Sequence, residues 1–200
     1  MLLLALKMIT PAQLQRYKYL LFDYDSTIAR VPLDWPQARD DFRTYLSREF
    51  PSLMIPEIAR VDEMEAIALK CSPKAKSKVF SFRFDLESKL DGSHEPIAET
   101  CQLIEELSEN ASMRLFVVSN NLHRTVDVGL QQLGLRQYFM RILGVDDVGV
   151  PKPATRAFEI LREEAGCLEK DCGFIGDNTR TDGGFCRALN IDFYNITERP

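Results

Sequence analysis

Short apolar runs alternate with amphipathic helical stretches along most of this 200-residue chain. The runs are residues 19–22, 114–118, 139–143, 172–175 and 191–194. Runs of this length, bounded by polar residues, are typical of strands buried on both faces. Apolar residues recur at helical spacing in the segments between them, at 96–110, 125–133, 155–165 and 182–189. The alternation predicts an α/β fold, a three-layer, Rossmann-like parallel sheet with helices on both faces.

One long segment, residues 29–91, breaks this alternation. It is too long for a simple connection in a compact domain, so we expect it to have structure of its own. Residues 36–50 and 56–69 have helical patterns, and Asp34 suits the N-cap of the first. Phenylalanine occupies every second position of residues 80–84, so the segment 79–84 fits either a strand or the edge of a helix. We predict a core of residues 1–28 and 92–200, with a mainly α-helical module of residues 29–91 inserted over the sheet.

Charge and cysteine content exclude several function classes. Lys and Arg number 25 and Asp and Glu 30, a net charge of −5 that argues against a nucleic acid partner but not against a small anionic substrate. The apolar start of the chain is too short for a membrane span, and we expect it to pack on the core. Five cysteines without a C-x-x-C pair predict free thiols and a cytoplasmic protein.

Polar clusters follow the apolar runs. They are residues 23–27 (DYDST), residues 119–121 (SNN), Lys152 between two prolines, and residues 176–182 (GDNTRTD). In an open α/β sheet, ligands bind beyond the carboxyl ends of the strands, so these clusters are expected to meet there. Each cluster alone is typical of a turn or a helix cap, but four in this order point to a functional site.

The same clusters resemble the motifs of the haloacid dehalogenase superfamily, in its phosphoglycolate-phosphatase-like branch with a helical cap of the C1 type. YLLFDYDSTI is similar to the first motif, VVSNN to the second, VPKP to the third and GDNTRTDGGFCRALNID to the fourth. The motifs extend over nearly the whole chain, whereas the inserted segment matches nothing that we can name. The resemblance implies that this segment is the cap.

The resemblance also implies the catalytic roles. Asp23 would be the nucleophile that forms an aspartyl-phosphate, and Asp25 would protonate the leaving alcohol and then activate water. Ser119 and the backbone N–H of Asn120 would hold the phosphoryl oxygens. Thr27 would also belong to the phosphate-binding residues, and it would support the turn of the first motif. Dehalogenase and phosphonatase members lack the second acidic residue, so Asp25 favours an oxygen leaving group.

A divalent cation is implied both by the resemblance and by electrostatics. The resemblance assigns Lys152 to the charge of the phosphate and of Asp23, and Mg²⁺ to Asp23, Asp177 and the backbone carbonyl of Asp25. Asp182 would bind the metal through water or orient its shell. Independently, each pair of like unit charges about 4 Å apart costs about 4 kcal/mol at an effective dielectric constant of about 20. One lysine does not offset such a cluster, and Mg²⁺ is the cation that best suits oxygen ligands.

These residues predict a Mg²⁺-dependent phosphatase that hydrolyses a small phosphorylated metabolite. Two alternatives stay open: a phosphomutase with the same chemistry, and a non-catalytic protein that binds a phosphorylated ligand. No nucleic acid or membrane partner is expected, and the sequence leaves monomer and homodimer open.

Side chains of the inserted segment are harder to assign. Trp35 is expected to anchor the module, with a place in the pocket wall as the alternative. A basic patch consists of Lys74, Lys76, Lys78 and Arg83. We expect it to be a solvated face. The alternative is that this patch, or Arg30 and Arg39, contacts a second anionic group of the substrate.

Overall fold

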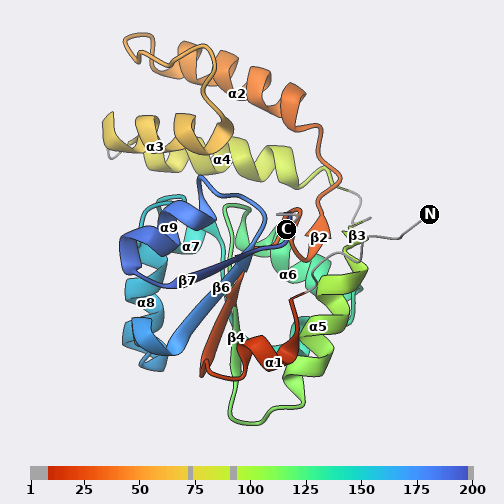
Figure 1. The fold of residues 1–200 in the computed structure, drawn as a ribbon. Coiled ribbons are helices and arrows are strands. Elements are labelled where there is room, and N and C mark those ends of the chain that lie inside the picture. Colours follow the sequence, from red (N-terminus) through yellow and green to blue (C-terminus); the bar gives the residue numbers. More distant parts are fainter. Residues whose placement is uncertain (1–8, 72–73, 91–93, 198–200) are drawn as a thin grey trace, which may run out of the picture.

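A five-stranded parallel sheet forms the centre of the computed structural model, which describes residues 9–71, 74–90 and 94–197 (Figure 1). The strand order is β5-β4-β1-β6-β7, and every pairing is parallel. The fold class predicted from the sequence is therefore confirmed. The strands are β1 (Tyr19–Phe22), β4 (Arg114–Val118), β5 (Phe139–Leu143), β6 (Cys172–Gly176) and β7 (Asp192–Asn195).

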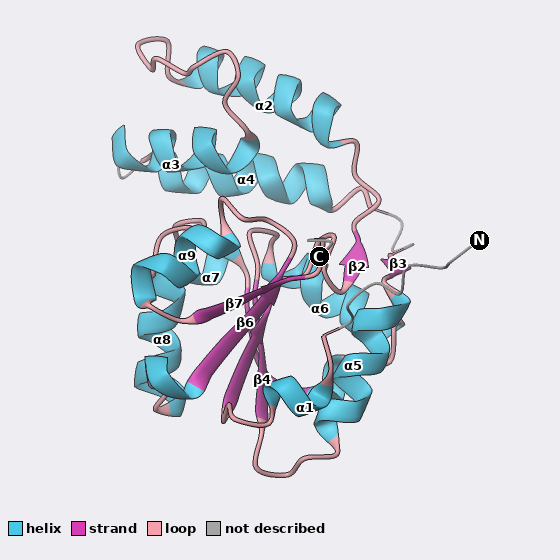
Figure 2. Ribbon diagram, in the orientation of Figure 1, coloured by secondary structure: helices cyan, strands magenta, loops and turns pink. Residues whose placement is uncertain are grey.

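Helices cover both faces of the sheet (Figure 2). All four residues of β1 are buried because successive side chains point to opposite faces: Leu20 and Phe22 pack on one layer, Tyr19 and Leu21 on the other. The first layer contains α1 (Pro11–Leu14), α5 (Ala98–Ser108) and α6 (His123–Gln132); the second contains α7 (Val145–Val148), α8 (Arg156–Ala165) and α9 (Asp182–Leu189). Two short 3₁₀ turns, Arg136–Tyr138 and Glu169–Asp171, precede β5 and β6.

Helix ends follow the sequence signals closely, with one exception. Gly166 and Asn190 take the left-handed conformation that ends α8 and α9, and Gly134 takes it just after α6. The exception is the segment 96–110, whose helical spacing begins at Pro96. This proline is not helical. It pairs instead in β3 (Glu95–Pro96), antiparallel to β2 (Ala29–Arg30), and α5 begins at Ala98.

Three helices from the inserted segment pack together above the carboxyl ends of the strands (Figure 1): α2 (Trp35–Glu49), α3 (Val61–Cys71) and α4 (Ala75–Glu87). We call them the helical module. The side chain of Asp34 caps α2 by accepting a hydrogen bond from Gln37 N at 3.0 Å. The module has its own apolar cluster, centred on Phe42, Leu46, Met64, Ala68 and Val79. The short β2–β3 ladder joins the chain entering the module to the chain leaving it.

The alternating phenylalanines of α4 belong to a helix and not to a strand. Phe82 packs on Phe42, with ring centroids 5.0 Å apart, whereas Phe84 is 48% exposed. Residues two apart on a helix point in different directions, so the alternation does not mark one buried face. Arg83, which the sequence assigned to a solvated basic patch, is instead 1% exposed.

Two sequence expectations concern parts of the chain outside the described residues. The boundary at residues 91 and 92 and the packing of residues 1–8 lie outside the described residues. Within the described ranges, no helix has the length and apolar character needed to cross a membrane. All five cysteines are free thiols, as the sequence predicted.

Candidate active site

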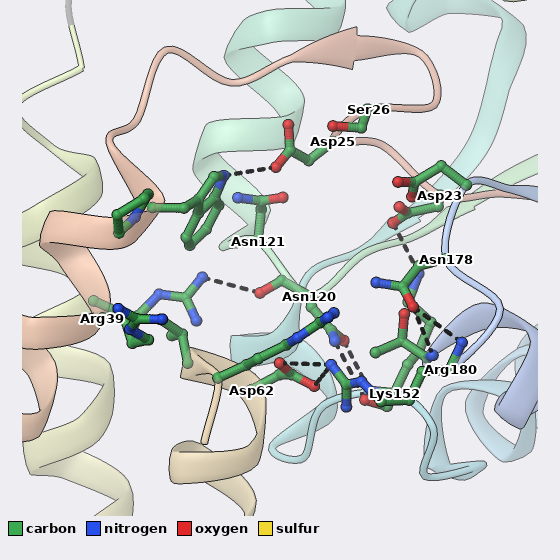
Figure 3. Close-up of a pocket in the computed structure, with 17 residues that line it drawn as sticks. Asp23, Asp25, Ser26, Arg39, Asp62, Asn120, Asn121, Lys152, Asn178 and Arg180 are labelled. Atoms are coloured by element: carbon green, nitrogen blue, oxygen red, sulfur yellow. Dashed lines mark hydrogen bonds and ion pairs between the residues drawn. The ribbon is translucent and has the colours of Figure 1, made fainter. Parts of the chain in front are cut away.

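A cavity of about 400 Å³ lies between the carboxyl ends of the strands and the helical module (Figure 3). Parallel strands bring their carboxyl ends to one edge, which explains why residues far apart in the sequence meet here. The core contributes the loops after β1, β4 and β6, together with Lys152. The cavity is lined by Asp23, Asp25, Ser26, Trp35, Pro36, Arg39, Arg60, Val61, Asp62, Arg83, Asn120, Asn121, Lys152, Asp177, Asn178, Arg180 and Thr181.

Lys152 lies at the centre of the buried charges. Its Nζ is 2.8 Å from Asp23 Oδ1 and 2.8 Å from Asp182 Oδ1, and it donates to the carbonyl oxygen of Val118 at 2.7 Å. Burial alone would lower the pKa of this ammonium, but the two carboxylates raise it above its ordinary value. Lys152 is therefore held as a cation between two acidic groups from different loops.

Three carboxylates form a compact acidic group. Oxygens of Asp23, Asp177 and Asp182 all lie within 4.8 Å of one another. Burial raises the pKa of Asp23 to about 8, an effect that Lys152 opposes, and burial and Asp182 raise the pKa of Asp177 to about 6. Both ionised forms are thus penalised without a further cation. Hard oxygen ligands at this spacing fit Mg²⁺.

The position of Asp182 depends on a glycine. A side chain at Gly176 would place its Cβ 2.4 Å from Asp182 Oδ2, far inside contact distance. The same carboxylate accepts a hydrogen bond from Asn178 N at 3.1 Å. The Gly-Asp pair after β6 therefore lets the carboxylate of α9 lie directly over the strand end.

Asp25 is held separately from the acidic group. Val31 N donates to its Oδ1 and the indole Nε1 of Trp35 donates to its Oδ2, each at 2.9 Å. Burial raises its pKa, and these two donors oppose the rise. Ser26, the next residue, has a φ of 61°, an uncommon left-handed conformation that turns the chain sharply after Asp25.

The loop after β4 contributes Asn120 to the cavity wall but not Ser119. Asn120 Oδ1 accepts from Lys152 N at 2.7 Å, and its Nδ2 donates to Lys152 O at 3.3 Å, so the side chain clamps the lysine's backbone. Ser119 is buried and exchanges hydrogen bonds with Asn121. Thr27 is completely buried, its hydroxyl has no hydrogen-bond partner among the described residues, and it does not line the cavity.

Ion pairs of Arg180 and a hydrogen bond of Arg83 connect the helical module to the core beside the cavity. Arg180, in the loop after β6, forms two hydrogen bonds with Asp62 of α3, at 2.9 and 3.1 Å, and an ion pair with Glu63. Arg83 of α4 donates to the carbonyl oxygen of Asn120 at 3.0 Å. The sequence singled out none of these interactions, because nothing in a local pattern tells which charged residues of two separate units will face each other.

Arg83 belongs to a buried ionic cluster inside the module. Its guanidinium pairs with Glu65 at 2.7 Å and with Glu87, and Glu87 also accepts from Leu122 N and the Thr125 hydroxyl of the core. Burial raises the pKa of Glu65 to about 7; Arg83 opposes the rise, whereas Glu87 and Asp62 add to it.

Replacing Glu65 by Gln should change the pH dependence of stability. A carboxyl whose pKa is raised from 4.5 to about 7 binds its proton more tightly when folded, so the free energy of unfolding falls as the pH rises through that window. Glu65→Gln cannot ionise. The difference between its free energy of unfolding and that of the wild type should therefore rise in favour of the variant by up to about 2 kcal/mol from about pH 5 to pH 7. Urea unfolding at both pH values measures this. The exposed Glu57→Gln is the control, and an equal difference at both pH values would contradict the prediction.

With this geometry in view, comparisons with known proteins identify the family. The sequence model for haloacid dehalogenase-like hydrolases matches residues 20–196, and the chain belongs to this family. It is 29% identical to the pyrophosphatase PpaX of Bacillus velezensis over 98 residues, which are 49% of this chain and 44% of PpaX. The alignment therefore spans less than half of that relative.

Solved structures share the fold at low sequence identity. A predicted phosphoglycolate phosphatase from Haemophilus somnus has a TM-score of 0.59 at 18% identity, covering 92% of this chain and 89% of that one. The magnesium-bound HAD-hydrolase YfnB from Bacillus subtilis has a TM-score of 0.53 at 21% identity, covering 89% and 87%. The similarity to the haloacid dehalogenase-like fold therefore includes the core and most of the inserted segment.

Proposed function

We propose that this chain is a Mg²⁺-dependent phosphatase that hydrolyses a small phosphorylated metabolite through an aspartyl-phosphate on Asp23. The observation that carries the proposal is the arrangement of charges around Lys152 beside the cavity: the carboxylate of Asp23, two further carboxylates and an ammonium. Asp25 lines the same cavity from the same loop as Asp23. The names of the pyrophosphatase and phosphoglycolate phosphatase relatives agree with phosphate-ester or phosphoanhydride chemistry.

The cation fits the chemistry of the donor set. Asp23, Asp177 and Asp182, with the backbone carbonyl of Asp25, would hold Mg²⁺; when bound, the ion neutralises the carboxylates and the phosphoryl oxygens. The raised pKa values of Asp23 and Asp177 are the expected signature of carboxylates gathered for a cation. The magnesium bound to YfnB supports the same assignment by analogy.

The reaction then divides into two displacements. An oxygen of Asp23 attacks phosphorus, the bond to the leaving oxygen breaks, and Asp25 gives its proton to that oxygen. Water next attacks the phosphorus of the aspartyl-phosphate, Asp25 takes the proton of the water, and the bond to Asp23 breaks to release phosphate. Lys152 keeps its charge beside Asp23 throughout.

Binding of the phosphoryl group involves the loop after β4. Asn120 lines the cavity, and its backbone N–H would donate to a phosphoryl oxygen. Ser119 would have to turn its hydroxyl from Asn121 Oδ1 toward the phosphate. Thr27 supports the turn from a buried position. The inserted segment of residues 29–91 would be the cap, and its helical module would limit the access of water to the bound substrate.

A cytoplasmic location completes the proposal. The free thiols of all five cysteines are consistent with a reducing compartment.

Activity of the purified protein tests the proposal directly. With Mg²⁺ it should release phosphate from phenyl phosphate, a chelator should abolish the release, and added Mg²⁺ should restore it. Mg²⁺ should also raise the melting temperature of the wild type but not of Asp177→Asn, because a ligand that binds only the folded state stabilises it. Phosphate release that continues unchanged in the presence of the chelator would contradict the metal assignment. Isomerised sugar phosphate without free phosphate would instead indicate a mutase.

A further inference from the structure

Both oxygens of Asp25 are held by donors on either side of the connection that leads into the helical module. Val31 lies on the core side, directly after β2, and Trp35 is the first residue of α2. The indole N–H can only donate, so Oδ2 accepts at 2.9 Å from a group that the module carries. Figure 3 shows Asp25 with its hydrogen bond reaching away from Asp23.

Contacts within the helical module hold the indole ring of Trp35 in place. The guanidinium of Arg83 lies 5.9 Å from the centre of the Trp35 ring, within the range of a cation–π contact. Arg83 is itself fixed by its buried ion pairs with Glu65 and Glu87. The capped first turn of α2, closed by Asp34, fixes the backbone of Trp35.

We propose that Trp35 is a positioning residue that orients the carboxyl group of Asp25 for proton transfer. This proposal rests on the acid–base role of Asp25 in the proposed function. Two donors, one on each oxygen, fix the plane of the carboxyl group, and each oxygen keeps a second lone pair for the proton that moves. Because one donor belongs to the module, Asp25 is correctly oriented only while the module is docked on the core.

The leaving group of the substrate separates this role from a structural one. The leaving oxygen of phenyl phosphate needs a proton. The leaving group of 2,4-dinitrophenyl phosphate departs as the stable 2,4-dinitrophenolate anion and needs none. Trp35→Phe keeps the aromatic ring and removes the N–H. It should lower kcat/KM for phenyl phosphate, which reports the first displacement alone, about 10-fold or more, a part of what general acid catalysis contributes. For 2,4-dinitrophenyl phosphate, kcat/KM should stay within about 2-fold, since its first displacement needs no proton from Asp25.

Two further variants make the outcome decisive. Tyr45→Phe removes another aromatic donor of α2, whose hydroxyl donates to Lys78 O and not to Asp25, and should leave the ratio of the two kcat/KM values unchanged. Asp25→Asn should change this ratio in the same direction as Trp35→Phe, and by more. The ratio does not depend on how much of a preparation is folded, so a loss of stability does not hide the effect.

Equal losses on both substrates in Trp35→Phe, or no loss on phenyl phosphate, would overturn the positioning role while the proposed function stands. An unchanged ratio in Asp25→Asn would overturn the acid–base role of Asp25 itself.

Discussion

Asp23→Asn should lose phosphate release from phenyl phosphate by on the order of 10⁴-fold or more. An amide cannot replace the carboxylate as the attacking nucleophile, and removal of a nucleophile typically eliminates nearly all of the catalysed rate. The fold should persist, because Asn has nearly the same shape and Lys152 keeps its ion pair with Asp182. Burial penalises the ionised form of Asp23, so its removal is not expected to lower the free energy of unfolding.

Two measurements make this prediction specific. The control is Asp192→Asn, an exposed carboxylate on β7 that pairs with Arg16 and should retain full activity. Asp25→Asn should form the intermediate from 2,4-dinitrophenyl phosphate without a general acid and hydrolyse it slowly, so mass spectrometry after an acid quench should find the phosphoryl group on Asp23. Activity of Asp23→Asn within about 10-fold of the wild type would exclude Asp23 as the nucleophile.

The core and its polar motifs could be predicted because their signals are local. Each strand is a buried run, and each run ends at the polar residues that need the sheet edge, as Phe22 precedes Asp23 and Val118 precedes Ser119. Helix ends at Gly166 and Asn190 require a left-handed residue, which the sequence displays directly. Such features depend on neighbours a few residues away, so one sequence is enough to locate them.

Contacts between the module and the core could not be predicted, because they depend on how two separate units dock. Arg83 looks like one of several exposed cations in the sequence, yet its guanidinium is buried between Glu65 and Glu87. Trp35 lines the cavity, the alternative to simple anchoring, and it reaches Asp25. Of the two arginines considered for a second anionic group, Arg39 lines the cavity, whereas Arg30 pairs with Glu95 at the β2–β3 ladder.

Lys152→Met should produce the largest loss of stability of any substitution considered. Its removal leaves the carboxylates of Asp23 and Asp182 buried and facing one another without a cation. Breaking a buried ion pair by removing one partner costs about 3–5 kcal/mol. Urea unfolding without metal at about pH 8 measures the loss. Lys78→Met is the matched control: its ammonium is half-exposed and pairs with Glu49, and its removal should change the free energy of unfolding far less than that of Lys152.

Added Mg²⁺ separates the two roles of this lysine. If the ion and the ammonium neutralise the same carboxylates, Mg²⁺ should recover more stability in Lys152→Met than in the wild type, since the variant's acidic group has lost its other cation. Activity should not recover in parallel, because in the proposed function the ammonium also offsets charge on the phosphoryl group, and loss of one such electrostatic partner lowers kcat by about 10²–10³-fold. An unfolding free energy equal to that of the wild type without metal would show that the acidic group does not need Lys152, and the charge arrangement proposed for the site would then be wrong.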